Sequence, residues 1–304
     1  MRLALSQFGA ELGQVSLNRR RMSEALDAAA AAGADLACFP ELAISGYLIS
    51  SSDYSAAMLA DVHQAERRIA ADGHRLGLTV VYGTPRRGPD GRLRNAVVLV
   101  TPDGRRLVYD KTHMVASERR AFVPGDELVV GPAGIGLACC YDLAFPEAMR
   151  TLALRGARLL LVPMAWEVER AFVMRQVLAA RAVENVVYVA AVNQTGDIGD
   201  FRFAGGTRVI DPLGATVVSA GPGDDLAVAD VDVAWADRLR SGEDPRTYPL
   251  LADRRPDLYA LRGPGPCPAG VDPVLSQTFI TTAGPARAET PVMTMHPQEE
   301  RHVG

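Results

Sequence analysis

The sequence predicts a layered α/β domain, in which helices cover the faces of β-sheets. Strand-like and helix-like segments alternate along the chain as far as residue 261. In the helical segments apolar residues recur at helical spacing, whereas the strand segments are short apolar runs. Helices interleaved with strands on this scale are typical of sheets covered by helices. With 304 residues, 48% of them hydrophobic, the chain can bury a sizeable core.

The first half of the chain is predicted to hold two helices. Ser16 has the side chain of an N-cap for the first helix, and Gly33 suits its C-terminal end. The apolar stripe of this helix consists of Met22, Ala25, Leu26 and Ala29. The second helix is expected at 56–76, with Gly77 at its end. The strands of this half are expected at 2–8, 34–39, 78–82, 96–100 and 106–109.

The second half continues the alternation. A helix is expected at 146–155, and a later helix presents an apolar face formed by Ala171, Met174, Leu178 and Ala182. The expected strands lie at 135–140, 158–162, 186–192, 207–210, 215–219 and 226–231. The run at 186–192 is apolar throughout, which is typical of a strand that is buried on both faces.

The composition changes after Leu261. The segment 262–304 is rich in Pro, Gly, Thr and Ala, lacks periodicity and ends in polar residues. We therefore expect one domain at 1–261, followed by an extension at 262–304 that is partly disordered or packs on a neighbouring subunit.

Charge and hydropathy exclude several classes of partner. The formal net charge is -4, and no basic stripe of the kind that nucleic-acid binding needs is visible. No apolar run reaches the roughly 18 to 20 residues that span a bilayer, and the N-terminal apolar stretch is too short for a signal peptide. We expect no nucleic-acid or membrane partner and a cytoplasmic location.

The four cysteines do not form a recognisable framework. They are Cys38, Cys139, Cys140 and Cys267. Their irregular spacing, without C-x-x-C or paired histidines, predicts neither disulfides nor a metal site, and no cofactor motif is present. Side chains of adjacent strand residues point to opposite faces, so at most one of Cys139 and Cys140 is expected to face an active site. Cys38 and Cys139 fit the role of small buried hydrophobes.

Lysine is nearly absent. Of the 32 basic residues, Lys111 is the only lysine. A compact ammonium cannot be replaced by a planar guanidinium where a point charge is required, so this lysine is a candidate for such a role. The alternative is that one lysine survives by chance in an arginine-biased chain.

Three polar segments stand at the ends of predicted strands. They read FPEL at 39–42, DKTHM at 110–114 and CYDLAFPE at 140–147. A rigid sheet holds catalytic groups at such positions while loops give access to them. Cys140 also begins a strand-to-helix turn, and we expect the helix N-terminus to favour its thiolate.

Taken in order, these segments resemble the nitrilase, or carbon–nitrogen hydrolase, superfamily. The resemblance extends to about Leu261 and includes the segments ERRAFVPG at 118–125, ARAVEN at 180–185 and DPLG at 211–214. It implies a four-layer αββα sandwich that pairs into an αββα-αββα dimer, or a higher homo-oligomer, and a Glu-Lys-Cys triad.

The resemblance assigns a role to each member of the triad. Cys140 is the nucleophile that forms a thioester with an amide-type carbon, and Glu41 is the general base. Lys111 stabilises the oxyanion together with a backbone N–H near Cys140, that of Tyr141. Glu118 orients Lys111 or the substrate amide, or takes part in proton transfer.

Three further residues are candidates for the substrate pocket. Trp166 follows the strand after which the family lines its pocket, although a core position is the alternative. Tyr47 reaches the pocket mouth or packs inside the fold. Ala144 is small and neutral where relatives carry a charged residue, which favours a neutral or bulkier acyl group. His113 is expected to be a structural hydrogen-bonding partner rather than a catalyst.

The reaction class follows from the residues after the nucleophile. Tyr141-Asp142 is similar to amidases and carbamoylases, whereas true nitrilases usually have Trp-Glu. The segment 251–259 resembles the aliphatic amidase branch. An amidase for a small-molecule amide is therefore the leading interpretation. An N-carbamoyl or ureido hydrolase, which needs a cation such as Arg175 or Arg202 for the substrate carboxylate, is the alternative. An amide-forming acyltransferase and a non-catalytic binding protein stay open.

Overall fold

The computed structural model describes residues 1–259 and contains two six-stranded sheets. The first sheet has the order β14-β1-β2-β3-β4-β5. Its strands are β1 (Arg2–Gln7), β2 (Leu36–Cys38), β3 (Thr79–Arg87), β4 (Leu93–Val100), β5 (Arg106–Asp110) and β14 (Asp225–Asp230). Strands β1, β2 and β3 run parallel, and the remaining neighbours pair antiparallel.

The second sheet has the order β13-β12-β9-β8-β7-β6. Its strands are β6 (Val129–Val130), β7 (Ile135–Leu137), β8 (Leu159–Met164), β9 (Tyr188–Asn193), β12 (Arg208–Ile210) and β13 (Thr216–Ser219). The central strands β7, β8 and β9 are parallel. A separate hairpin joins β10 (Thr195–Ile198) to β11 (Phe201–Ala204).

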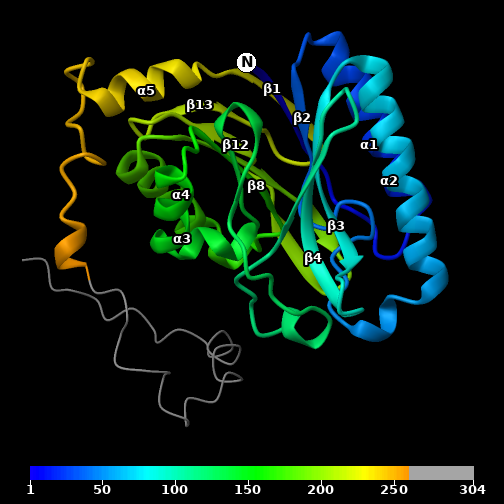
Figure 1. Ribbon diagram of the computed structural model, residues 1–304. Coiled ribbons are helices and arrows are strands. Elements are labelled where there is room, and N and C mark those ends of the chain that lie inside the picture. The colour runs from blue at the N-terminus through cyan, green and yellow to red at the C-terminus, as the bar shows by residue number, and fades with distance from the viewer. Residues whose placement is uncertain (260–304) are drawn as a thin grey trace, which may run out of the picture. The chain divides into compact units, whose positions relative to one another are not determined.

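Helices form the outer layers of the sandwich. Figure 1 shows α1 (Val15–Ala31) and α2 (Ala56–Leu76) on one side, and α3 (Pro146–Leu154) and α4 (Ala171–Asn185) on the other, with both sheets between them. A fifth helix, α5 (Val233–Ser241), follows the last strand. The predicted αββα sandwich is therefore confirmed. None of the helices in the described part of the chain is long and apolar enough to cross a membrane.

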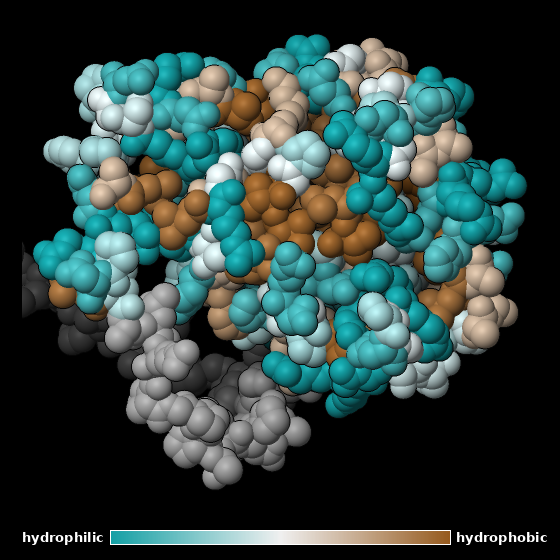
Figure 2. Space-filling model, in the orientation of Figure 1, coloured by the Kyte–Doolittle hydropathy of each residue, from teal (hydrophilic) through white to brown (hydrophobic). Residues whose placement is uncertain are grey.

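Alternation along the strands builds the core on both faces of the first sheet. On β1, Leu3 and Leu5 point into the space between the sheets, whereas Ala4 faces the layer of α1 and α2. Cys38 on β2 also lies between the sheets. Figure 2 shows the molecule in the orientation of Figure 1, with the layers seen edge-on. Hydrophobic side chains gather in the middle of this face, and hydrophilic side chains cover most of the remainder. The inter-sheet core therefore holds the sheets together.

Several element boundaries differ from the sequence prediction. Ser16 lies inside α1 and does not cap it, because the helix already begins at Val15 after Gln14, which makes no side-chain cap bond. The second helix is confirmed at its predicted bounds, with the Ser55 side chain accepting from Met58 N–H and Gly77 in the left-handed conformation.

Other differences concern the strands. Strand β4 begins earlier than predicted, at Leu93, and β7 ends earlier, at Leu137. Strand β6, the β10–β11 hairpin and helix α5 have no counterpart among the predicted elements. The predicted domain boundary at 261 and the extension at 262–304 lie outside the described residues.

Candidate active site

Lys111 stands at the centre of a buried polar cluster. It follows β5 directly, and its side chain is 0% exposed. Its Nζ donates to Glu41 Oε1 at 2.7 Å and to both carboxylate oxygens of Glu118, at 2.6 and 2.9 Å. Burial alone would lower the pKa of Lys111, but Glu118 and Glu41 hold it well above its usual value. The ammonium is therefore charged throughout the neutral range.

Glu41 lies just past β2 and is fixed by its own backbone. Its N–H donates to the Met164 carbonyl at the end of β8, 3.3 Å away, so it also joins the two sheets. Its carbonyl accepts from Gln194 Nε2 at 2.8 Å. The next residue, Leu42, has a φ of 50°, in the left-handed region that few non-glycine residues adopt. This turn is thus held in one strained conformation.

Gly83 on β3 makes room for the turn that carries Glu41. A Cβ at this position would lie 2.4 Å from the backbone nitrogen of Leu42 and 2.6 Å from Glu41 Cα. Both distances are far below van der Waals contact, and the contacted atoms are backbone. Only glycine therefore lets β3 approach the catalytic turn this closely.

The two oxygens of the Glu41 carboxylate have different surroundings. Oε1 accepts from Lys111 Nζ, from Asn95 Nδ2 at 2.7 Å and from Cys139 Sγ at 3.2 Å. Oε2 is buried and has no hydrogen-bond partner among the described residues. Buried polar atoms are nearly always paired, so an orphan at this position indicates a place for a reacting group. Oε2 is available to accept a proton.

Glu118 is saturated with donors. Besides Lys111, its Oε1 accepts from Tyr47 Oη at 3.1 Å and Asn95 Nδ2 at 3.3 Å, and its Oε2 accepts from Val115 N–H at 3.0 Å. Burial raises the pKa of Glu118, while Lys111 opposes that rise. The arrangement suits a residue that holds Lys111 in place, since neither oxygen is free to serve as a base.

Cys140 begins a short 3-10 turn, Cys140–Ala144, after β7. Its φ of 44° lies in the left-handed region, a conformation that costs roughly 1–2 kcal/mol for an ordinary residue. Such strain concentrates at functional sites, where it presents a side chain. Cys140 is buried, with 8% of its surface exposed.

The protonation state of Cys140 differs from the sequence prediction. Burial, and next the negative charge of Glu41, raise the pKa of the thiol well above its usual value, while Lys111 lowers it. The expectation that a helix N-terminus would favour the thiolate is wrong, because desolvation and a carboxylate outweigh a single short turn. The thiol is neutral at rest, so its attack requires a base.

Asp142 connects the chain around Lys111 to the chain around Cys140. This fully buried carboxylate accepts from Tyr109 Oη at 2.6 Å, Cys139 N–H at 2.8 Å and His113 Nδ1 at 2.8 Å. It also accepts from the His113 backbone N–H and the Thr112 hydroxyl. The His113 ring, in turn, stacks on Phe145. These contacts give His113 a structural place, as the sequence predicts.

The remaining predicted pocket residues occupy different positions. Tyr47 is buried, with its ring against Phe201 and Phe203 and its hydroxyl on Glu118. Trp166 is buried, and its indole Nε1 has no partner among the described residues. Tyr141 and Ala144 lie on the turn of Cys140 and are partly buried; the Ala144 carbonyl accepts from Arg181.

Three residues of the cluster are not among the predicted site residues: Asn95, Asp142 and Cys139. Asn95 is a polar residue inside the apolar strand β4, but it lies one residue before the predicted start of that strand at residue 96. Cys139 is fully buried, as expected for a hydrophobe, but its thiol contacts Glu41. Strand pairing has already ended at Leu137, so the alternation that was to turn Cys139 away from the site does not apply.

The arginines proposed for a substrate carboxylate lie at the surface. Arg175 is exposed, and the Arg202 side chain is 64% exposed, with Asp197 nearby. These positions do not favour the carbamoyl hydrolase. Residues 1–259 contain no group of three or more His, Cys, Asp or Glu side chains arranged for a metal ion.

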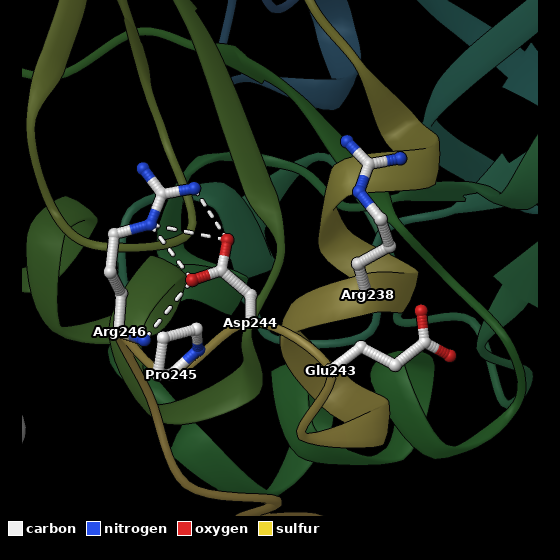
Figure 3. Close-up of a pocket in the computed structure, with 5 residues that line it drawn as sticks. All are labelled: Arg238, Glu243, Asp244, Pro245 and Arg246. Carbon is white, nitrogen blue, oxygen red and sulfur yellow. Dashed lines mark hydrogen bonds and ion pairs between the residues drawn. The ribbon is translucent and has the colours of Figure 1, made fainter.

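A surface hollow lies at the end of α5, apart from the polar cluster. Figure 3 shows its lining, Arg238, Glu243, Asp244, Pro245 and Arg246. Arg246 pairs with Asp244 within the hollow, and Arg238 pairs with Asp232. Both cations are thus neutralised, and the hollow contains none of the chemistry found around Lys111.

Curated proteins similar to this chain are hydrolases. A protein of Pseudomonas protegens named "Hydrolase in pqqF 5'region" is 35% identical over 85% of this chain and 90% of its own length. An (R)-stereoselective amidase of Pseudomonas sp is 33% identical over 84% of this chain and 92% of its own length.

Solved structures with a similar fold are amidases. An amidase from Nesterenkonia sp. AN1 superposes with a TM-score of 0.74 at 31% identity, covering 85% of this chain and 98% of that one; it is a glutamate-to-glutamine variant with acrylamide added to its active-site cysteine. A double variant of the same amidase, in complex with acrylamide, has a TM-score of 0.75 at 31% identity and covers 85% of this chain and 95% of that one. The family model described as carbon-nitrogen hydrolase matches residues 2–241. The chain therefore belongs to the carbon–nitrogen hydrolase family.

Proposed function

We propose that this protein is an amidase that hydrolyses a small, non-peptide carboxamide to a carboxylate and ammonia through a thioester on Cys140. One observation carries the proposal: a buried lysine is shared between two carboxylates, of which only Glu41 keeps an unpartnered oxygen. This arrangement supplies a base and a fixed positive charge close to a neutral thiol, which is what cysteine-dependent acyl transfer requires.

The first step forms the thioester. Glu41 Oε2 takes the thiol proton as the Cys140 sulfur attacks the amide carbon, and the carbonyl electron pair moves to the oxygen. Lys111 and the backbone N–H of Tyr141 stabilise the resulting oxyanion. The carbon–nitrogen bond then breaks, the nitrogen takes the proton from Glu41, and ammonia leaves.

The second step hydrolyses the thioester. Glu41 takes a proton from water as the water oxygen adds to the thioester carbon, and Lys111 again faces the developing oxyanion. The carbon–sulfur bond breaks, the Cys140 sulfur recovers the proton from Glu41, and the carboxylic acid is released and ionises. The enzyme returns to the neutral thiol that its burial favours.

Glu118 acts in this scheme as a positioning residue for Lys111. Both of its oxygens are engaged by donors, which supports orientation of the ammonium over proton transfer. Tyr47 stabilises Glu118 in turn, because its hydroxyl donates to Glu118 Oε1. Trp166 offers its unpartnered indole N–H to the substrate, and Ala144 leaves space for a neutral acyl group on the turn of Cys140.

Assembly and location are part of the proposal. Apolar side chains on the outer helix layer, among them Phe172 at 66% exposure, Val173 and Leu154, suit pairing of two copies into a homodimer. Light scattering of the purified protein tests this pairing.

Three unpaired thiols in the described part of the chain suit the reducing cytoplasm, which cell fractionation tests.

Ammonia release tests the activity. Purified protein and its Cys140→Ala variant are compared on acetamide, propionamide, butyramide, N-carbamoyl amino acids and aliphatic nitriles. The proposal expects turnover of amides by the wild type and none by the variant. Turnover of carbamoyl compounds alone would favour the ureido hydrolase, and turnover by the variant would remove Cys140 from the mechanism. Formation of a substituted amide when an amine is added would favour an acyltransferase.

A further inference from the structure

We propose that Cys139 is a positioning residue for Glu41: its thiol is the third donor that engages Glu41 Oε1 and leaves Oε2 as the proton-accepting atom. The inference rests on the proposed function, because it concerns the base of that reaction. The observation behind it is the 3.2 Å contact between Cys139 Sγ and Glu41 Oε1.

Both the backbone and the side chain of Cys139 are held in place. Its backbone N–H donates to Asp142 Oδ2 at 2.8 Å, and its side chain is completely buried. Burial, and next the charge of Glu41, raise the pKa of the Cys139 thiol well above its usual value, so the sulfur keeps its hydrogen. A neutral thiol beside a carboxylate can only donate, and the contact is therefore S–H to Oε1.

The set of donors on Oε1 makes the carboxylate asymmetric. Lys111, Asn95 and Cys139 all engage Oε1, whereas Oε2 is buried without a partner. Lys111 and Asn95 also bond Glu118, so they are shared between two carboxylates. Cys139 is the donor of the three whose side chain contacts Glu41 and not Glu118. It is therefore the group that fixes Glu41 independently of its neighbour.

Loss of the thiol has two expected consequences. A donor to a carboxylate favours its charged form, so without the donor Glu41 accepts a proton more readily from solvent and the base is lost at a higher pH. The carboxylate also gains freedom to rotate, which lowers kcat because the base is held less firmly in the position that the reaction requires. A loss of packing alone can lower kcat but does not move the acid limb.

The chain offers a matched control in Cys38. This residue is also a fully buried free cysteine in the inter-sheet core, and its sulfur faces its neighbour's carbonyl, Phe39 O, at 3.9 Å. Truncation of Cys38 to alanine removes the same atom from the same core without touching Glu41.

The test measures kcat/KM against pH on the amide of the panel that the wild type hydrolyses fastest. We expect Cys139→Ala to move the acid limb of the profile upward by about half a pH unit or more and to lower kcat by ~5- to 10-fold with little change in KM. Cys139→Ser keeps a donor and should restore the wild-type limb. Cys38→Ala should keep the wild-type limb and kcat. If Cys139→Ala does not fold, Cys139→Val, which fills the space without a donor, must show the same shift.

A profile of Cys139→Ala, or of Cys139→Val, that coincides with that of Cys38→Ala would overturn the inference. A serine variant that shifts as far as the alanine variant would do the same. These results differ from failure of the proposed function, which would appear as absent amide turnover in the wild type or as retained turnover in Cys140→Ala.

Discussion

Lys111 and Glu118 form a bidentate ion pair inside the sandwich, with Nζ 2.6 and 2.9 Å from the two carboxylate oxygens. Nζ also donates to Glu41 Oε1 at 2.7 Å. These contacts hold the ammonium in place, and the Lys111 side chain is 0% exposed. A fixed charge in a water-excluded site stabilises a developing oxyanion without prior reorganisation.

Removal of the lysine should destabilise the fold as well as abolish activity. Lys111→Met leaves two buried carboxylates without a cation, and loss of one partner of a buried pair costs about 3–5 kcal/mol. The double variant Lys111→Met/Glu118→Gln should recover part of this loss yet stay inactive. Urea unfolding measures the stability of the single and the double variant, and ammonia release measures their activity. Arg75→Met, which breaks an exposed pair with Asp27, should change stability by about 1 kcal/mol or less. A single lysine variant as stable as this control would contradict the account.

Substitution of the base should separate hydrolysis from thiol reactivity. Glu41 raises the pKa of Cys140 and Lys111 lowers it, so Glu41→Gln removes a raising influence and keeps the lowering one. We expect amide turnover to fall by ~100-fold or more, because no group accepts or returns the proton. The thiol of the variant should titrate at a lower pH than in the wild type.

Fluoroacetamide labelling and thiolate absorbance across pH measure this separation. The amidase from Nesterenkonia sp. AN1 gives a precedent, since its glutamate-to-glutamine variant carries the acetamide moiety of fluoroacetamide on the active-site cysteine. A variant whose thiol titrates at a higher pH than that of the wild type would contradict the predicted sign.

The approach of β3 to the catalytic turn predicts a sensitive glycine. Gly83→Ala places a Cβ 2.4 Å from the Leu42 nitrogen, so the turn that carries Glu41 must move. A shift of about 1 Å at a reacting group can cost ~100-fold in rate. Gly221→Ala is the control, since its Cβ would meet only a side-chain oxygen of Asp225, at 3.6 Å. Equal kcat/KM values for the two variants would exclude this role of Gly83.

Asp142 should behave as a structural link between the two halves of the site. Asp142→Asn replaces an acceptor by an NH₂ group opposite the hydroxyl of Tyr109 and the N–H of Cys139, both of which are donors. Buried donors left without acceptors cost about 1–3 kcal/mol each. We expect lower stability and lower kcat together. Asp237→Asn, at a partly exposed pair with Arg158, should affect stability by about 1 kcal/mol or less and leave kcat unchanged.

The sequence predicted the order of the elements because the hydrophobic periodicity of each segment survives in the fold. The second helix has its predicted bounds since Ser55 and Gly77 are strong local signals that tertiary structure does not oppose. The prediction of Ser16 as the N-cap is wrong because α1 begins at Val15, two residues before the predicted first helical residue, and so contains that serine. The three strand-end segments also stand where the strands end, which brings Glu41, Lys111 and Cys140 to one region of the sandwich.

The contacts between individual side chains of the site could not be predicted from the sequence. Asn95 and Cys139 contact Glu41 through tertiary geometry that no spacing rule contains. The direction of the pKa shift of Cys140 depends on burial and on the distance of Glu41, which local pattern cannot supply. The left-handed backbone at Cys140 likewise follows from the packing around it, because no glycine marks the position.

The central claim is that Cys140 forms a thioester with the acyl group of the amide. Rapid acid quench during turnover of butyramide, followed by intact and peptide mass spectrometry, tests it most directly. The account predicts an acyl adduct on Cys140 of the wild type, absent from Cys140→Ala. An acyl group on Cys139, or wild-type turnover without any adduct, would contradict it.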